Sequence, residues 1–399
     1  MFLVRICLSA ISKPELVLFL ISFFRASYPG PYLYMDLSEQ IIKKITSTGP
    51  ISFKAFMEMC LYAPGHGYYA VAGNRIGPGG DYYTSPALTP AFGTTIARQL
   101  EEMWRYLGRG AFTIVEYGAG TGSLCADILA ALQHNQRMYE GIRYRIIEKG
   151  MATEHREELL EKVSWHRSIK EFPPIRGCVL SNELLDNFPV HQVVMEDELM
   201  EVFVGFQNGF VETLLPAKPE LKDYFKALGV ELPRGFRTEV NLDAVTWIGE
   251  VARAIRRGYV LTIDYGYPSE ELYKPCRSAG TLLAYYRHTI TDDLYNHVGE
   301  QDITAHVNFS ALSHWGRKNG LSDCGFTDQC HFLLSLDAPE AIRTLALREE
   351  DVIGAARRAV LLNYRLLVDM GRMFKVLIQE KGGCNKELLV LRDLTGNGK

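Results

Sequence analysis

The spacing of hydrophobic and polar residues predicts helices in the first part of this chain. Residues 37–49 and 52–63 place apolar side chains three and four positions apart, which is typical of amphipathic helices. The segment 64–93 is rich in Gly, Pro and Tyr, so we expect a loop there. Residues 92–108 return to the helical spacing and predict a long helix.

From Phe112 onward, short apolar runs alternate with helical patterns. The runs "FTIVEYGAGTG", "YRIIE", "CVLSNELLDNF" and "GYVLTIDYGY" begin as strands, and the stretches "SLCADILAALQ" and "ATEHREELLEKV" have helical spacing. We expect the intervening "QHNQRMYEG" to be a loop. Strands that alternate with helices predict an α/β fold, with a parallel sheet covered by helices on both faces.

Two further regions have patterns of their own. The segment 191–257 predicts a hairpin with Asn208-Gly209 at its turn, followed by two helices. The C-terminal part predicts a helix at 309–321, a strand at 326–334, helices within 338–372 and a final strand at 372–381.

The first 34 residues differ from the rest. They carry two short apolar runs, and the second, Leu16–Phe24, is much shorter than the roughly 20 residues of a membrane-spanning helix. Met35 opens a good helix start, "MDLSEQIIKKI". We expect residues 1–34 to be a miscalled start, with a leader segment as the alternative, and we expect no stable membrane insertion.

Composition and charge narrow the function classes. The chain has 399 residues, of which 47% are hydrophobic and 23% charged, as in ordinary globular proteins. A net charge of −4 gives no indication of nucleic acid binding. The eight cysteines form no CxxC pair, so we expect no metal site and a reducing, cytoplasmic environment.

The stretch "EYGAGTG" at 116–122 is the strongest indication of a ligand site. Gly118, Gly120 and Gly122 follow a predicted strand and precede a predicted helix, where ligands bind in open α/β sheets. The spacing is GxGxG and not the GxGxxG of a dinucleotide fingerprint, because position 123, where that fingerprint has its third glycine, is Ser123. This disfavours a nicotinamide dehydrogenase.

Two acids indicate which ligand the glycines bind. Glu116 would repel a pyrophosphate but suits a cationic ligand such as S-adenosyl-L-methionine, which carries a sulfonium and an ammonium group. Glu148 ends the second strand, where a carboxylate can accept both ribose hydroxyls. A surface acid at a strand end is the alternative for Glu148. The order strand, GxGxG, helix, strand and Glu favours a methyltransferase.

Several motifs together resemble the MidA-like family of S-adenosyl-L-methionine-dependent methyltransferases. They include "ISFKAFMEMCLYAPGHGYY", "GPGGDYYTSP", "VEYGAGTGSLCADIL", "SNELLDNFPV", "VLTIDYGY", "GTLLAYYRH" and "GEQDITAHVNFSAL", and the resemblance covers about 38–382. It implies a class I, Rossmann-like sheet of seven strands with the last antiparallel. The mitochondrial branch of this family is associated with arginine methylation and assembly of respiratory complex I.

The resemblance directs attention to "SNELLDNFPV", which follows the fourth strand and faces the methyl donor in this architecture. Asn182, Glu183 and Asp186 are candidate catalytic residues, since carboxylates can hold a planar guanidinium by paired hydrogen bonds. The alternative is a helix N-terminus at which acids favour the dipole. Asp264, beyond the fifth strand, is either an acid near the substrate or a strand-end cap.

Two other motifs supply candidates. In "DITAHVNF", Asp302 and His306 are four apart and share a face if the segment is helical. His306 could accept a proton after transfer, or the two could hold a loop as an Asp–His pair. In "GDYYTSP", Thr84 and Ser85 could cover the amino-acid end of the cofactor, or simply stabilise the loop.

These patterns lead to one prediction for the whole chain. We expect an N-terminal helical cap at 35–110, a methyltransferase core at 111–190 and 258–382, an α+β insertion at 191–257 and a tail at 383–399. The cofactor-binding candidates are Glu116, Gly118, Ala119, Gly120, Gly122, Glu148, Thr84 and Ser85. The expected function is methyl transfer to a protein, with arginine as the acceptor that the resemblance implies. A cofactor-binding assembly factor without activity and a small-molecule methyltransferase are the alternatives, and a eukaryotic chain would act in the mitochondrial matrix.

Overall fold

Seven strands form the main path of the central sheet in the order β15-β16-β10-β5-β2-β3-β4, and a short eighth strand, β14 (Val307–Asn308), pairs with the end of β10. The computed structural model describes residues 35–71, 83–148, 161–347, 351–383 and 387–392. The strands are β2 (Phe112–Tyr117), β3 (Ile142–Ile147), β4 (Val163–His166), β5 (Ile175–Asn182), β10 (Ile255–Tyr267), β15 (Ser322–Asp328) and β16 (Phe374–Lys381). Neighbours from β10 to β4 pair in parallel, and β16 is antiparallel to both β10 and β15. The expected seven-stranded sheet with an antiparallel last strand is therefore confirmed.

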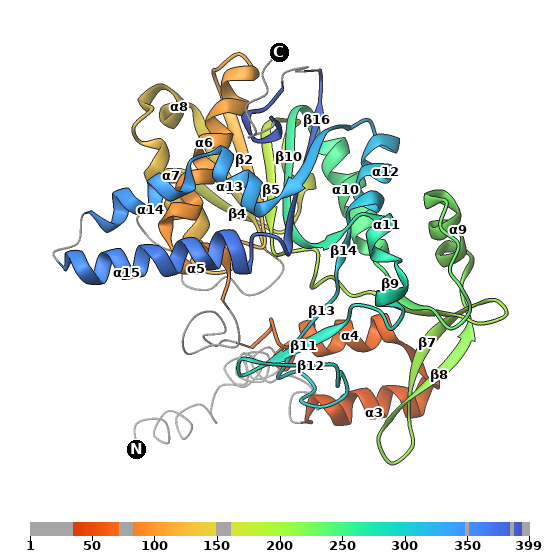
Figure 1. Cartoon of the computed structure of the whole chain (residues 1–399). Helices are drawn as coiled ribbons and strands as arrows, with labels where there is room; N and C mark the ends of the chain where they lie inside the picture. Colours follow the sequence, from red (N-terminus) through yellow and green to blue (C-terminus); the bar gives the residue numbers. More distant parts are fainter. Residues whose placement is uncertain (1–34, 72–82, 149–160, 348–350, 384–386, 393–399) are drawn as a thin grey trace, which may run out of the picture.

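Helices cover both faces of this sheet because side chains alternate along each strand. In β2, Phe112 and Ile114 pack against α6 (Pro90–Tyr106) and α7 (Ser123–Leu132), while Val115 packs on the other side against α10 (Leu242–Ala254) and α12 (Phe309–Lys318). The helices α13 (Gln329–Ser335) and α14 (Ala338–Ala346) join the first group. Figure 1 shows this layered arrangement in its upper part.

A second lobe lies at the bottom of Figure 1, next to the carboxyl ends of the strands. It contains α3 (Leu37–Thr48) and α4 (Phe53–Tyr62) beside a sheet in the order β1-β7-β6-β9, with β8 paired to β7. These strands are β1 (Ile51–Ser52), β6 (His191–Met195), β7 (Leu199–Phe206), β8 (Phe210–Pro216) and β9 (Arg237–Val240), and α9 (Pro219–Leu228) packs nearby. Because β1 pairs with β7, the N-terminal segment and the 191–257 segment share one sheet.

The predicted hairpin in this lobe is present. Phe206 pairs with Phe210 across the turn, and Asn208 has a φ of 58°, in the left-handed region that Asn tolerates well. The small sheet of β11 (Leu283–Tyr286), β12 (Thr289–Thr291) and β13 (Asp302–Thr304) also contributes Ala284 and Ile303 to the core of this lobe. The predicted domain boundaries remain predictions.

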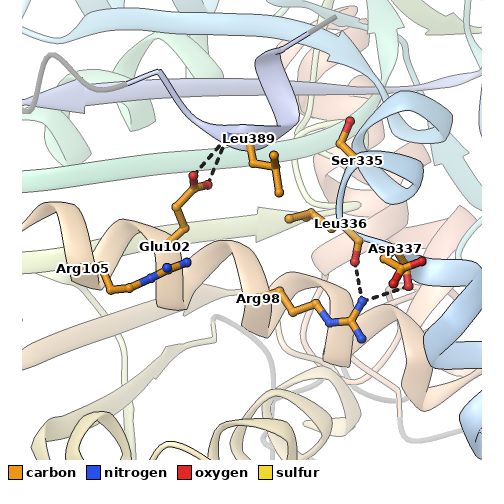
Figure 2. A pocket seen from close by; sticks show the side chains of 7 residues that line it. All are labelled: Arg98, Glu102, Arg105, Ser335, Leu336, Asp337 and Leu389. Atoms are coloured by element: carbon orange, nitrogen blue, oxygen red, sulfur yellow. Dashed lines mark hydrogen bonds between the residues drawn. The ribbon is translucent and has the colours of Figure 1, made fainter. Parts of the chain in front are cut away.

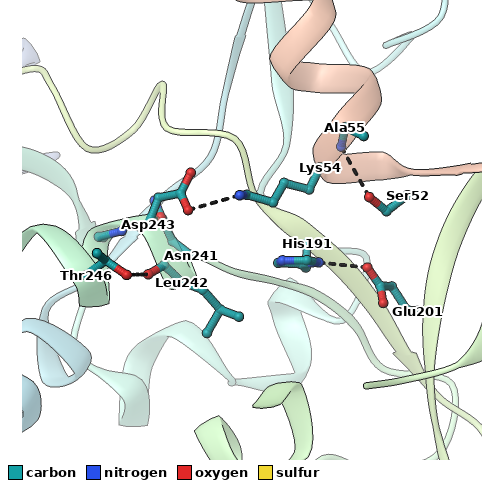
Figure 3. A network of polar contacts seen from close by, with 10 residues as sticks. Ser52, Lys54, Ala55, His191, Glu201, Asn241, Leu242, Asp243 and Thr246 are labelled. Carbon is teal, nitrogen blue, oxygen red and sulfur yellow. Dashed lines mark hydrogen bonds and ion pairs between the residues drawn. The ribbon is translucent and has the colours of Figure 1, made fainter. Parts of the chain in front are cut away.

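One ion pair and two hydrogen bonds join the lobes, and Figure 3 shows the ion pair. Lys54 of α4 lies 3.0 Å from Asp243 of α10, and the Asn241 side-chain amide donates to the Leu185 carbonyl at 3.0 Å. Within the lower lobe, the buried His191 ring lies 2.7 Å from Glu201. The Tyr62 hydroxyl donates to Asn187 Oδ1 at 2.7 Å and so connects α4 to the segment after β5.

Some local predictions were wrong. Residues 136–141 form a short helix, α8 (Gln136–Gly141), instead of a loop, because Asn135 Oδ1 accepts from the Met138 amide and caps it. The predicted strand at 326–334 ends at Asp328, whose carboxylate accepts from the His331 amide and starts α13. Strand β4 had not been predicted. The segment 1–34 lies outside the described residues. Residues 152–160 of the predicted helix at 152–163 also lie outside them.

No helix among the described residues has both the length and the apolar composition needed to cross a membrane.

Candidate active site

The candidate site residues lie at the carboxyl ends of four neighbouring parallel strands. Tyr117 at the end of β2 pairs with Ile147 at the end of β3 and with Ser181 in β5, and Asn182 pairs with Ile263 in β10. The glycine loop, Glu148, the 182–186 turn and Asp264 follow these positions directly. Parallel strands end at the same edge, so the topology brings these segments of the sequence together.

The glycine loop has the backbone that its sequence predicts. Gly118, Gly120 and Gly122 have φ values of 66°, 53° and 74°, in the left-handed region where a side chain is disfavoured. A Cβ on Gly118 would lie 2.8 Å from Leu184, whereas a Cβ on Gly120 would meet no heavy atom within 4 Å. The Gly120 backbone therefore faces open space, which a ligand lying against the chain can occupy.

The two acids predicted to bind the cofactor lie in different surroundings. Glu116 is buried on the α6 and α7 side, where it accepts a hydrogen bond of 2.6 Å from the Tyr144 hydroxyl. Burial raises the pKa of Glu116 to about 7, and the charge of Glu148 adds to this increase. Glu148 directly follows β3 and is half-buried, and its amide donates to the His166 carbonyl at 3.1 Å.

Glu183, which directly follows β5, has an uncommon backbone conformation. Its φ is 52°, and its amide donates to the Ile263 carbonyl at 3.0 Å. Its Oε1 accepts from the Asn182 side-chain amide at 3.1 Å and from the Ser85 backbone amide at 3.3 Å. Burial, with the charge of Asp186, raises the pKa of Glu183 to about 8. A half-buried acid with two neutral donors is suited to receive a cation.

Asp264 and Asp186 lie beside Glu183 and differ in their hydrogen-bond partners. Asp264 is fully buried and accepts from the amides of Leu184 and Leu185 at 3.1 and 2.9 Å, so it stabilises the turn that carries Glu183. Asp186 is also buried, which raises its pKa to about 6. Its Oδ1 has no hydrogen-bond partner within the described part of the chain. A buried oxygen of this kind can accept from a bound ligand.

Two tyrosines of the N-terminal segment add to this acidic site, and the sequence analysis did not select them. The Tyr69 hydroxyl donates to both oxygens of Asp302 at 2.8 and 2.9 Å. The ring of Tyr62 stacks on that of Tyr69 with 5.6 Å between centroids. The nearby charges of Asp302 and Asp186 add to burial in raising the pKa of Tyr62. The motif "LYAPGHGYY" contains both tyrosines, but its spacing gives no indication of their partners.

The segment that carries Asp302 and His306 is not helical, so the two residues do not share a helix face. The segment is extended, with Asp302 in β13 and Val307 beginning β14 (Val307–Asn308). His306 lies between the rings of Tyr265 and Tyr267, at 5.6 and 5.4 Å between centroids. Burial lowers the pKa of His306 to about 4, so its ring is neutral near pH 7. Its buried Nδ1 has no hydrogen-bond partner among the described residues.

The loop that ends at Thr84, which we call the lead-in loop, is followed by Ser85, and Ser85 contacts Glu183. Thr84 precedes the short helix α5 (Ser85–Leu88) and is half-buried, while Ser85 is fully buried. Besides the bond from its amide to Glu183, the Ser85 hydroxyl donates to Gln329 Oε1 at 3.4 Å and lies 3.9 Å from Met370 Sδ. The loop therefore connects Glu183 to the C-terminal helices.

A separate cavity lies between α6, the α13–α14 turn and the C-terminal turn η6 (Leu389–Leu391), as Figure 2 shows. Arg98 donates to the carbonyls of Leu336 and Asp337 at 2.5 and 2.9 Å, and Glu102 accepts from the Leu389 amide. These bonds fasten the C-terminal segment to α6, so the cavity lining has a structural role. None of the predicted site residues lines this cavity.

Comparisons with known proteins agree with this fold. A family model for S-adenosyl-L-methionine-dependent methyltransferases matches residues 95–327. Among curated proteins, the chain is 28% identical to the mitochondrial protein arginine methyltransferase NDUFAF7 homolog of Drosophila melanogaster, over 87% of this chain and 85% of that protein. It is 26% identical to the mitochondrial protein arginine methyltransferase NDUFAF7 of Rattus norvegicus, over 84% of this chain and 81% of that protein.

A solved structure extends the comparison to a bound ligand. A Burkholderia thailandensis protein crystallised with S-adenosyl-homocysteine is 30% identical to this chain, with a TM-score of 0.79, over 91% of this chain and 97% of that one. S-adenosyl-homocysteine is the product that remains when S-adenosyl-L-methionine gives up its methyl group. The open space at Gly120 and the unpartnered Oδ1 of Asp186 suit a ligand at the same edge of the sheet. The chain belongs to the family of S-adenosyl-L-methionine-dependent methyltransferases.

Proposed function

We propose that this methyltransferase modifies an arginine side chain of a protein. The observation that carries the proposal is the half-buried, desolvated Glu183 carboxyl, whose two hydrogen-bond donors, Asn182 and the Ser85 amide, are both neutral. Asp186 and Asp302 add two more acids nearby, since the charges of both raise the pKa of Glu183. A guanidinium is a planar, permanent cation, so it complements such a site. The names of the curated relatives support the same acceptor.

For the cofactor, we assign the glycine loop from Gly118 to Gly122, including Ala119, to the backbone contact. Glu148 would accept the ribose hydroxyls, and Glu116, on the adjoining strand, would favour the cationic end. Thr84 and Ser85 would cover the site from the lead-in loop. The cofactor, when bound, supplies a methyl group on a sulfonium, which is electrophilic without further activation.

The chain's own residues would then orient the acceptor and remove a proton. Glu183 and Asp186 hold two edges of the guanidinium and localise its charge away from the attacking nitrogen, and Asn182 keeps Glu183 in place. Tyr69 fixes Asp302 in the wall of the site. A new N–C bond forms as the S–C bond breaks, and the nitrogen loses one proton. His306 is neutral near pH 7, so its Nδ1 can accept that proton.

Radiolabelled methyl transfer into cell extract tests this proposal. Glu183→Gln keeps the shape of the side chain but removes its charge, so labelling of the acceptor protein should fall about a hundredfold or more, as when a transition-state interaction is lost. Binding of S-adenosyl-homocysteine should persist, because Glu183 faces the acceptor. Glu220→Gln, an exposed acid of α9, is the matched control and should label normally.

Three outcomes would contradict the proposal. Undiminished label in Glu183→Gln would remove Glu183 from the mechanism. Label confined to small molecules in the wild type would favour a metabolite methyltransferase. If the wild type gave no label at all but its absence impaired a protein assembly in cells, the non-catalytic alternative would be correct.

The similarity to the curated relatives also supports a proposal for the cellular compartment. Both curated relatives are named as mitochondrial, so a eukaryotic form of this chain would act in the mitochondrial matrix, where the family resemblance connects it with respiratory complex I assembly. A bacterial form would act in the cytoplasm. Fractionation of native cells with an antibody to this chain decides between compartments.

A further inference from the structure

One surface of the molecule exposes large apolar side chains in a row. Ile353, Val360, Leu361, Tyr364 and Val368 are each between 52% and 71% exposed. They lie on α15 (Val352–Asn363) and on the π-helix that continues it, η5 (Tyr364–Asp369). Their spacing of 7, 8, 11 and 15 positions from Ile353 places them on one side of the helix. We call these five residues the α15 face.

The opposite side of the same helix packs against the sheet domain. Ala355 and Leu366 are buried, and Ala359 and Leu362 pack against the core of the sheet domain. The helix therefore carries aliphatic side chains on both sides: Leu362 and Leu366 face the core, and the α15 face lies toward solvent, where an ordinary amphipathic surface helix is polar. An exposed apolar row of this size indicates an interaction surface.

The charge of this segment differs in sign from that of the whole chain. Between residues 351 and 375 there are five basic and two acidic side chains, a net charge of +3, whereas the chain carries −4. Arg357 lies on the same side of the helix as the α15 face, Arg358 and Arg365 border that face, and Arg372 follows it in the sequence. Arginine can place its aliphatic part along an apolar surface while its guanidinium reaches a polar layer.

We propose that the α15 face binds the surface of an anionic phospholipid bilayer. Aliphatic side chains enter the interface between headgroups and acyl chains, and the arginines contact the phosphates. Two copies of the face would bring positive segments together, which disfavours self-association. A peptide partner would require a groove, whereas this face is the convex side of one helix.

The α15 face is connected to the candidate active site. The guanidinium of Arg365 lies 5.1 Å from the centre of the Tyr83 ring, and that ring stacks on His288. Met370, directly after η5, lies against Ser85, whose amide donates to Glu183. In Figure 1, α15 runs along the lower edge of the upper lobe. Binding through this face would hold the methyltransferase site close to a membrane surface.

Sedimentation of the full chain with lipid vesicles tests the proposal, which does not depend on the methyl acceptor. The wild type should sediment with phosphatidylglycerol vesicles, bind phosphatidylcholine vesicles much more weakly and release as salt rises. Replacing Val360 and Leu361 by Gln should weaken binding roughly tenfold or more. Replacing Arg357 and Arg372 by Gln should weaken it by roughly fivefold per arginine.

Matched variants control for exposure and charge elsewhere. Ile290→Gln removes an exposed aliphatic side chain on β12, and Arg234→Gln removes an exposed arginine far along the chain from this helix. Both should bind vesicles like the wild type. All variants should bind S-adenosyl-homocysteine normally, which shows that they are folded.

Three results would overturn the proposal. The first is a wild type that does not bind phosphatidylglycerol vesicles. The second is unchanged binding by the Val360 and Leu361 variant, because another part of the chain would then be responsible. The third is a wild-type dimer, seen by light scattering, that the same variant dissociates, because a second copy would then cover the face.

Discussion

The backbone amide of Ser85 donates a hydrogen bond to Glu183 Oε1 at 3.3 Å, although the two residues are 98 positions apart. Ser85 begins the short helix after the lead-in loop, and Glu183 follows the fourth strand of the parallel set. The bond therefore joins a residue predicted to cover the cofactor to one predicted to hold the acceptor. Any movement of the loop changes the environment of the Glu183 carboxyl.

Gly120→Val should abolish cofactor binding. A valine would fill the open space at this backbone and would also be strained at a φ of 53°. Titration calorimetry with S-adenosyl-homocysteine is the measurement. Gly229→Val is the control, because Gly229 has a φ of 65° and open surroundings but lies at the end of α9. If both variants bound normally, the glycine loop would not be the cofactor site.

Glu148→Ala should weaken the same ligand without unfolding the protein. A hydrogen bond to a charged group contributes about 1.5–3 kcal/mol, so the dissociation constant should rise roughly ten- to a hundredfold. Glu161→Ala, a nearby exposed acid just before β4, is the control. An unaltered constant for Glu148→Ala would make it a surface acid at a strand end.

Methyl transfer should rise with pH up to about pH 8. The pKa of Glu183 is raised to about 8, so the carboxyl is mostly protonated at pH 7 and cannot hold a cation in that form. At limiting acceptor, the initial rate of labelling should increase almost tenfold per unit between pH 6 and about pH 7.5 and then level off. His306, with a pKa of about 4, stays neutral throughout this range. A rate independent of pH would contradict the role of an ionised Glu183.

Glu183→Gln should stabilise the protein, and more strongly at higher pH. A carboxyl with a pKa of about 8 in the folded chain and 4.5 as its ordinary value binds more protons folded than unfolded between these values. Its contribution to stability therefore falls as pH rises through this window and is lowest above pH 8. Thermal melting at pH 5 and pH 8.5 measures the effect. The difference in melting temperature between variant and wild type should be small at pH 5 and larger at pH 8.5, whereas an equal difference at both would contradict the desolvation of the Glu183 carboxyl.

The sequence by itself determined the parallel sheet, the glycine loop and the family. These depend on local patterns: apolar runs of strand length, helical spacing, and glycines where the backbone has positive φ. The GxGxG loop could be predicted because Gly118, Gly120 and Gly122 all adopt conformations that other residues rarely adopt. The Asn208-Gly209 turn was predictable for a similar reason.

Only the tertiary structure decided which polar side chains meet. Tyr69 and Asp302 are 233 positions apart, and no spacing in the sequence relates them. The role of Asp264 as a support for the Glu183 turn required the register between β5 and β10. The helical interpretation of Asp302 and His306 failed because a four-residue spacing is compatible with two separate short strands once other segments pair with them. Burial, which raises the pKa of Glu183 and lowers that of His306, is likewise a property of the packed lobes, because desolvation depends on neighbours that are distant in sequence.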